Sequence, residues 1–193
     1  MAGLKLSYVH GASEQPLIGQ TIGQFFDAVC DKWPARPALV VRHQNVRLSY
    51  GELRQQVDRL AAGLLTLGLH PGDRIGIWSP NNSEWVLTQF ATAKAGLILV
   101  NINPAYRIAE LEYALNKVGC KALILAERFK TSDYVGMLRE LTPELGHATP
   151  GKLESARLPA LHSAVEIFPP NRPFGAKSLE MSVFPGLRPG LTE

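Results

Sequence analysis

The polar side chains best placed to do chemistry outside a buried core lie in one short segment, residues 101–107, which has the sequence NINPAYR. The segment follows the apolar run GLILV and precedes the helix-like run IAELEYAL. A strand, a polar turn and then a helix is a place where α/β proteins often bind a ligand. Asn103 followed by Pro104 also predicts a plain turn, because asparagine tolerates unusual backbone angles and proline cannot extend a strand. The residues alone leave both interpretations open, with Tyr106 expected to pack its ring and leave its hydroxyl in water.

The other candidate residues favour structural roles. The five histidines are far apart in sequence, and none has an i,i+4 partner of the metal-binding kind; they are His10, His43, His70, His147 and His162. The chain has no Gly-x-Ser-x-Gly elbow and no G-x-G-x-x-G fingerprint. The fragment TPGK at 149–152 lacks the rest of a phosphate-binding loop. We therefore predict no catalytic, cofactor-binding or metal-binding residue.

The glutamates, cysteines and tryptophans also favour structural roles. Four glutamates are expected as helix-surface charges: Glu52, Glu84, Glu110 and Glu112. Cys30 and Cys120 lie in apolar patterns, which predicts reduced core thiols in a cytosol-like compartment, with a disulfide or a catalytic thiol as the alternative. The three tryptophans, Trp33, Trp78 and Trp85, are expected in the core.

Composition excludes several classes of protein. The 193 residues are 46% hydrophobic and 19% charged, which suits one globular core, and the net charge of +3 comes from basic residues that look scattered. This charge is too small to suggest nucleic acid. The first 16 residues carry no long apolar segment of the secretory kind, and no apolar run reaches the length of a membrane span.

The elements expected to position these side chains alternate between strands and helices. Helices are predicted over 21–33 with Thr21 as N-cap, from a Ser49–Glu52 capping box to Gly68, from Ser83 as N-cap to Gly96, over 108–118 and over 131–141. Strands are predicted over 38–41 and 46–49 as a hairpin, within 71–78, and over 97–101, 121–126 and 164–168. This alternation predicts a three-layer α/β fold, a mostly parallel sheet with helices on both faces.

Burial can also be predicted from these patterns. The helix after Ser49 is expected to bury a stripe of Leu53, Val57, Leu60, Ala61, Leu64 and Leu65, and the helix after Ser83 is expected to bury Trp85, Val86, Phe90 and Ala93. The strands at 97–101 and 121–126 are nearly continuous apolar runs, which predicts burial on both faces. Residues 169–193 contain five prolines and three glycines without a period and are expected to form a poorly ordered tail after a domain at 1–168.

Residues 48–124 resemble the N-terminal region of AMP-forming acyl-CoA synthetases, which belong to the adenylate-forming superfamily. The likeness rests on an ordered series: SYGEL, GLHPGDRIGIW, PNNSEWV, AKAGLILVNINPAY and ELEYAL. SYVHG at 7–11, with GCKALI and RLPAL within 119–165, is most similar to the medium-chain fatty-acyl branch. The resemblance spans residues 7–168 and implies fatty acid, ATP and coenzyme A as substrates with Mg²⁺. It also implies an acyl-adenylate intermediate that the thiol of coenzyme A attacks.

Some parts of that family pattern are missing from this sequence. We find no Ser/Thr/Gly-rich loop followed by Pro-Lys-Gly, no Thr-Gly-Asp motif and no lid domain with the adenylating lysine. We therefore expect an amino-terminal piece of a longer enzyme, inactive alone, that binds no cofactor by itself. The resemblance also implies that Arg107 faces the coenzyme A side of a complete enzyme, where a basic side chain suits phosphates; we assign no site to it.

Two rival functions stay open. The first is a non-catalytic binding or assembly module that self-associates through apolar surface left uncovered. The second is a free-standing nucleotide binder of doubly wound type. The expected location is the cytoplasm, or the mitochondrial matrix for a eukaryotic source, and the acyl-chain length is not predictable from these residues.

Overall fold

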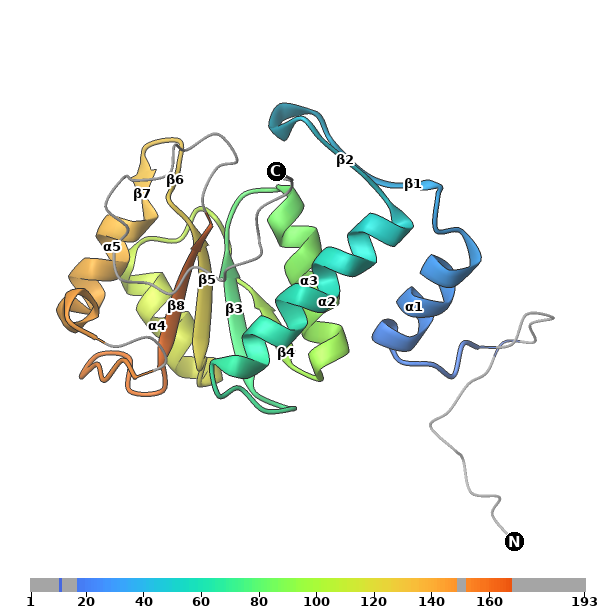
Figure 1. Cartoon of the computed structure of the whole chain (residues 1–193). Coiled ribbons are helices and arrows are strands. Elements are labelled where there is room, and N and C mark those ends of the chain that lie inside the picture. The colour runs from blue at the N-terminus through green and yellow to red at the C-terminus, as the bar shows by residue number, and fades with distance from the viewer. Residues whose placement is uncertain (1–10, 12–16, 149–151, 168–193) are drawn as a thin grey trace, which may run out of the picture.

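The computed structural model describes residues 11, 17–148 and 152–167, and Figure 1 shows the whole chain. The α-helices are α1 (Ile22–Lys32), α2 (Tyr50–Thr66), α3 (Ser83–Ala95), α4 (Ile108–Val118) and α5 (Tyr134–Leu141). The strands are β1 (Pro37–Val41), β2 (Val46–Ser49), β3 (Arg74–Trp78), β4 (Ile98–Asn101), β5 (Ala122–Ala126), β6 (Arg128–Phe129), β7 (Ser132–Asp133) and β8 (Ser163–Ile167). Short 3-10 helices are η1 (Arg42–Gln44) and η2 (Pro143–Gly146). The expected elements are all present within this range.

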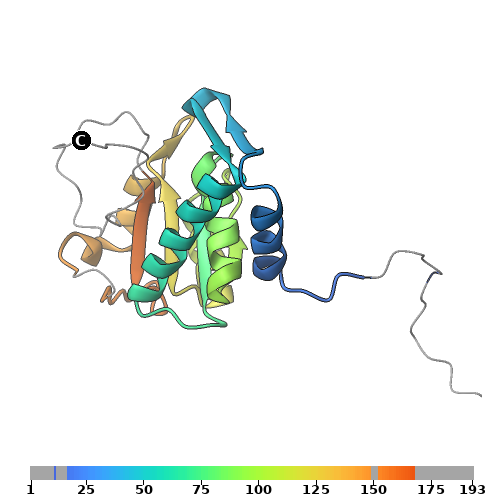
Figure 2. The same ribbon diagram turned by 45° about the vertical axis from the view of Figure 1, so that its right-hand side comes forward.

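A parallel sheet in the order β4-β3-β5-β8 forms the middle layer. Helices α2 and α3 lie on one face and α4 and α5 on the other (Figures 1 and 2). Side chains alternate along each strand, so Ile124 packs into the α2–α3 core, whereas Leu123 and Leu125 pack into the α4–α5 core. The predicted three-layer α/β fold is therefore confirmed. The hairpin β1–β2 is a separate antiparallel pair.

Helix starts follow local capping chemistry. Thr21 and Ser49 cap α1 and α2 through full capping boxes with Gln24 and Glu52, as predicted. The prediction of Ser83 as a cap is wrong by one residue, because the Asn82 side chain accepts the bond from the Trp85 amide at 2.8 Å. Asparagine is as good a cap as serine, so a run of both leaves the start ambiguous.

The buried faces of two helices differ from the predictions. In α2 the stripe is buried except Leu65, which is 44% exposed. In α3 the predicted face is only half-buried; the fully packed face consists of Ser83, Leu87, Thr88, Ala91, Thr92 and Ala95. Thr88 and Thr92 can face the core because each hydroxyl donates to a backbone carbonyl four residues earlier, at 2.7 and 2.8 Å.

The two apolar strands also differ in burial. All five residues of β5 are buried, as predicted, because β5 lies between β3 and β8. The same prediction is wrong for β4, in which Ile98 is 46% exposed. Within the part of the chain that the structure describes, β4 is an edge strand, so its neighbours cover it on one side only.

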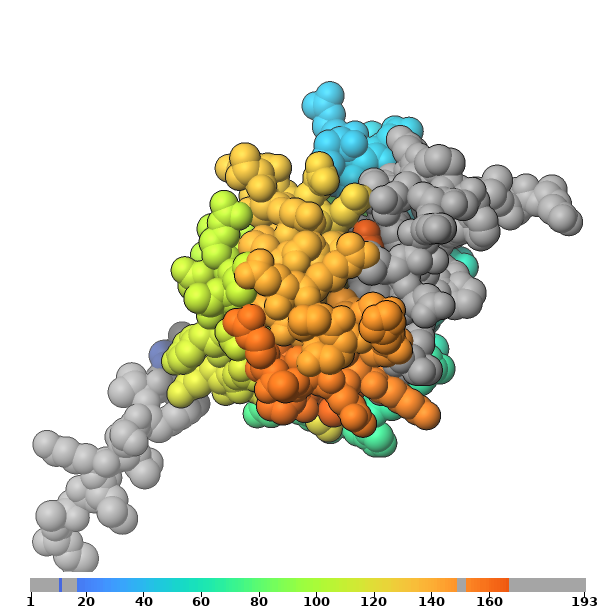
Figure 3. All heavy atoms as spheres, turned by 90° about the vertical axis from the view of Figure 1, so that its left-hand side faces the viewer, coloured from blue at the N-terminus to red at the C-terminus, as the bar shows by residue number. Residues whose placement is uncertain are grey.

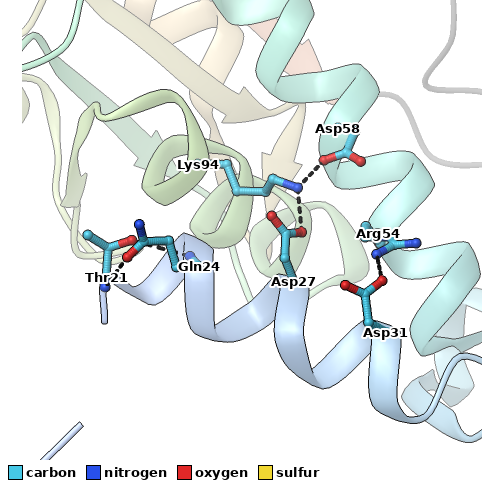
Figure 4. Close-up of polar contacts among 7 residues, drawn as sticks. All are labelled: Thr21, Gln24, Asp27, Asp31, Arg54, Asp58 and Lys94. Atoms are coloured by element: carbon cyan, nitrogen blue, oxygen red, sulfur yellow. Dashed lines mark hydrogen bonds and ion pairs between the residues drawn. The ribbon is translucent and has the colours of Figure 1, made fainter. Parts of the chain in front are cut away.

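Helix α1 is held to α2 and α3 by an ion-pair cluster (Figure 4). The Lys94 ammonium on α3 contacts Asp27 of α1 at 2.6 Å and also Asp58 of α2. Arg54 of α2 pairs with Asp31 of α1. Beside the cluster the Phe26 and Phe90 rings stack with centroids 4.3 Å apart. No helix within the described ranges is both long and apolar enough to cross a bilayer.

Candidate functional site

The candidate site is the edge of the sheet at which the parallel strands end. Strands β3, β4 and β5 end at Trp78, Asn101 and Ala126, and each is followed by a polar segment. Because parallel strands place their carboxyl ends at one edge, residues 79–82, 102–107 and 127 lie along the same rim. The structure therefore brings the NINPAYR segment next to the start of α3.

The NINPAYR segment forms a tight turn, as Asn103-Pro104 predicts. The Tyr106 amide donates to the Asn103 carbonyl at 3.0 Å, and the Ala105 amide donates to the Asn103 side chain at 2.9 Å. Tyr106 is half-buried against the α4–α5 core. These two hydrogen bonds within the segment support its structural interpretation.

Two buried aromatic side chains form hydrogen bonds to the backbone of this turn. Trp78 and Tyr134 are fully buried and stack with ring centroids 3.9 Å apart. The Trp78 indole donates to the Asn103 carbonyl at 3.2 Å, and the Tyr134 hydroxyl donates to the Pro104 carbonyl at 2.7 Å. Sequence reasoning missed Tyr134, because its spacing indicates only a helix face and not a hydroxyl partner 30 residues earlier.

Arg107 lies where the turn enters α4, as expected, and its side chain is exposed. Its amide donates to the Glu110 carboxylate at 3.1 Å. Burial raises the pKa of the Tyr134 hydroxyl, while the positive charge of Arg107 opposes that rise. Among the described residues, Arg107 makes no ion pair, which leaves its charge available at the rim of the sheet.

The start of α3 is occupied by side chains of the same chain. The Ser83 amide donates to the Gln44 side chain at 2.7 Å, and the Gln44 amide group donates to Glu84 at 2.7 Å. Asn82 donates to Ser79 at 2.8 Å while it caps the helix. Glu84 is therefore a half-buried hydrogen-bonding group and not the free surface charge expected. An anion at this helix start would have to displace Gln44.

Thiols and histidines add no chemistry to this rim. Cys30 and Cys120 are free and buried, as predicted. Burial raises the pKa of Cys120 to about 12, and burial also raises the pKa of Cys30. The described histidines, His43, His70, His147 and His162, are exposed. Within 17–148 and 152–167, no three His, Cys, Asp or Glu side chains gather as a metal site.

The predicted tryptophans and glutamates can be checked against the structure, whereas some other predicted features lie outside the described residues. Trp78 is in the core as predicted, whereas Trp33 and Trp85 are only half-buried. Glu52 and Glu110 are exposed and complete capping interactions, and Glu112 pairs with Arg157 at 2.9 Å. His10, residues 149–151 of the TPGK fragment and the predicted tail at 169–193 lie outside the described residues.

Comparison with known proteins identifies the class to which this fold belongs. The family model for the AMP-binding enzyme matches residues 26–167, most of the chain, so the protein belongs to the AMP-binding enzyme family. The resemblance to adenylate-forming acyl-CoA synthetases is confirmed.

The names of individual relatives are more specific than the description of the family. Three proteins named "Medium-chain acyl-CoA ligase ACSF2, mitochondrial" come from Rattus norvegicus, Homo sapiens and Danio rerio, and each is 48% identical to this chain. The rat alignment spans 165 residues, 86% of this chain and 27% of the relative. The chain thus spans about a quarter of the length of these relatives.

Solved structures support the fold. The Mycobacterium tuberculosis fatty acyl CoA synthetase has a TM-score of 0.63 at 22% identity, over 76% of this chain and 26% of that one. The anthranilate CoA ligase AuaEII, solved with anthranoyl-AMP, has a TM-score of 0.64 at 20% identity, over 82% of this chain and 27% of that one. At these identities the likeness concerns the fold alone.

Proposed function

We propose that this chain is the N-terminal part of an ATP-dependent fatty-acyl-CoA ligase, which converts a carboxylate, ATP and coenzyme A to acyl-CoA, AMP and pyrophosphate. The observation that carries the proposal is 48% identity over 165 residues to proteins named medium-chain acyl-CoA ligase. Fold likeness alone would not distinguish this reaction from others of the same fold. The matching residues include the whole rim at the carboxyl ends of β3, β4 and β5.

Residues of this chain supply the frame of such a site rather than its reactive groups. Transfer of an adenylyl group needs fixed donors and a cation around the triphosphate. The described residues bring no set of metal ligands together, and the α3 start is bound by Gln44 and Asn82. On this basis we propose that the chain does not hold Mg²⁺-ATP on its own.

We accordingly propose that the chain alone does not activate fatty acids. Pyrophosphate release should be measured with ATP, octanoate, coenzyme A and Mg²⁺, using a complete ligase as the positive control. The expected rate is that of the blank without protein. Robust turnover by the purified chain would refute the proposal that the chain alone is inactive, although it would leave the family assignment intact.

A chimera tests the ligase origin itself. The region of the rat relative that aligns with residues 26–167 should be replaced by these residues, and acyl-CoA formation from octanoate should be measured. The expected result is a soluble chimera with substantial activity, because buried positions of one fold tolerate related apolar side chains. A folded chimera without activity would count against a ligase frame.

A second candidate function, a non-catalytic assembly module, is favoured by exposed apolar side chains. On α1, Ile22 is 60% and Phe25 is 43% exposed, three positions apart and so on one face of the helix. Such a face suits self-association. Light scattering across a concentration series tests this, and a monomer at every concentration would exclude the assembly module.

The location also remains a proposal. We place the chain in a reducing aqueous compartment, the cytoplasm or the mitochondrial matrix, because two buried free thiols suit such conditions. The relatives' names carry the word mitochondrial, which supports the matrix. Fractionation of the source cells with an antibody to this chain would decide between the two.

A further inference from the structure

The positive charge of the chain is concentrated in one segment. Residues 32–51 contain four basic residues, Lys32, Arg36, Arg42 and Arg47, together with His43 and no acidic residue. The whole chain has 20 basic and 17 acidic residues. The remainder therefore holds 16 basic and 17 acidic residues, so the segment accounts for all of the net charge of +3. The net positive charge therefore lies in one short stretch of the sequence, although basic residues occur throughout the chain.

Residues 37–49 of this segment form the projecting β1–β2 hairpin, and Lys32 and Arg36 lie just before it. All five basic side chains are exposed, and none makes an ion pair with another described residue. The β1–β2 hairpin extends beyond the sheet and helices in Figures 1 and 2, and its residues, in cyan, stand at the top of Figure 3.

An apolar element accompanies these cations. Val40 is 45% exposed and is the cross-strand partner of Arg47, so both side chains point to the same face of the hairpin. At the base of the hairpin, the Lys32 ammonium and the Arg36 guanidinium lie 4.5 and 5.4 Å from the centroid of the Trp33 ring. Exposed cations beside an aliphatic and an aromatic side chain suit the headgroup region of a bilayer.

Hydrogen bonds connect the hairpin to the rest of the fold at both ends. At the base, the Tyr50 amide donates to the Arg36 carbonyl at 3.0 Å and the Gly51 amide donates to the Pro34 carbonyl at 2.9 Å. At the tip, Gln44 is fixed to Ser83 and Glu84. The neighbouring carboxylates are already engaged: Glu84 with Gln44, Glu52 with Ser49, and Asp31 with Arg54. A preordered group of cations loses little entropy when it meets a charged surface.

We propose that the β1–β2 hairpin, with Arg36, Arg42 and Arg47, is a docking surface for anionic phospholipid bilayers. Exposed cations spread along a projecting hairpin suit an extended anionic plane, whereas a peptide needs a pocket for its anchor side chains. Each cation near an anionic leaflet adds to the attraction, and this attraction is screened by salt. The inference stands apart from the ligase proposal, because binding needs no turnover.

Vesicle co-sedimentation tests the proposal with the full chain. The vesicles should be pure phosphatidylcholine or phosphatidylcholine with roughly a third phosphatidylserine, at about 0.05 M and about 0.5 M salt. We expect binding only to the vesicles with phosphatidylserine and only at low salt. The double variant Arg42→Glu/Arg47→Glu should bind at least about 25-fold more weakly, because each of the two basic residues contributes about a fivefold factor.

Arg128→Glu/Arg139→Glu is the matched control, since both arginines are exposed and lie in β6 and α5, outside residues 32–51. The control should bind less tightly only by its change in net charge, well short of the hairpin variant. Circular dichroism should confirm that both variants fold. Equal losses in both variants, or no sedimentation with anionic vesicles, would overturn the proposal. Binding to soluble polyglutamate without binding to vesicles would also overturn it and would favour an acidic protein.

Discussion

Gly76 lies at the most crowded point of the sheet. A Cβ atom at this position would lie 2.9 Å from Ile102 Cδ1, 3.0 Å from Leu123 Cδ1 and 3.2 Å from Cys120 Sγ. All three neighbours are buried and cannot move without disturbing the α4–α5 core. The glycine therefore sets the distance between β3 and the side chains that cover it.

We predict that Gly76→Ala lowers the free energy of unfolding by about 1–3 kcal/mol, as overpacking typically does. Urea denaturation would measure the change. Gly146→Ala serves as the control, because nothing lies within 4 Å of the Cβ position in η2. An unchanged midpoint for Gly76→Ala would mean that the core is looser than described.

Cys120 predicts a pH dependence. Burial raises its pKa from 9.0 to about 12. Below pH 9 both the folded and the unfolded chain keep the proton, whereas between pH 9 and 12 only the unfolded chain releases it. The thiol's share of the unfolding free energy should thus fall as pH rises above 9, by at most about 1.4 kcal/mol per pH unit.

Comparison with Cys120→Ala isolates this effect. The difference in stability between the wild type and the variant should be constant near pH 8 and should shrink above pH 9. A difference that stays constant through pH 10 would show that the thiol is accessible to water in the folded state. Other groups that titrate in this range, tyrosines and lysines, cancel because both proteins contain them.

Individual residues were predictable where their roles are local. The caps at Thr21 and Ser49 follow from patterns that span four positions, and the turn at Asn103-Pro104 needs only two residues. The Tyr134–Pro104 and Gln44–Ser83 hydrogen bonds join residues 30 and 39 positions apart. No single-sequence pattern encodes such pairs, so the supports of the candidate site could not be predicted.

At the scale of elements, α1 depends on charge as well as apolar packing. Burial alone would lower the pKa of Lys94, but its hydrogen bonds to Asp27 and Asp58 outweigh that effect and raise the pKa. The stabilisation is therefore present below pH 10.5, the ordinary value, and is lost only as pH rises past the raised pKa.

We predict that Lys94→Met loosens α1. The substitution keeps the length of the side chain but leaves Asp27 and Asp58 without their shared cation, and it should cost about 1.5–3 kcal/mol. Hydrogen exchange should show faster exchange across Ile22–Lys32 than across α4. Lys117→Met, at an exposed position late in α4, is the control. Uniformly faster exchange in all helices would instead indicate global destabilisation.

The sequence could predict which segments are helices and which are strands, but it could not predict which neighbours would cover each of them. The spacing of apolar residues defines α1, α2 and α4 because one stripe per helix is apolar. In α3 apolar and small polar residues occur on every side, so its buried face depends on neighbours. Likewise β4 and β5 are similarly apolar, and only the strand order makes one an edge and the other central.

At the scale of the whole molecule, the exposed face of α1 predicts association. If Ile22 and Phe25 drive self-association, Ile22→Lys/Phe25→Lys should shift the mass measured by light scattering toward the monomer. Both side chains are exposed, and neither is part of the Phe26–Phe90 stack, so stability should change by no more than about 0.5 kcal/mol. An oligomer that persists in this variant would place the contact elsewhere, for instance at the open edge of β4.

The strand order also determines how long β3 is without its neighbouring strands while the chain is being synthesised. Central strand β3 pairs first in sequence with β4, where Arg74 meets Ile98, and then with β5, where Ile75 meets Ala122. Both neighbours leave the ribosome after β3, so Ile75, Ile77 and Trp78 spend that interval without a sheet around them. Slowed translation between codons 79 and 121 should therefore lengthen the period in which a nascent chain engages chaperones.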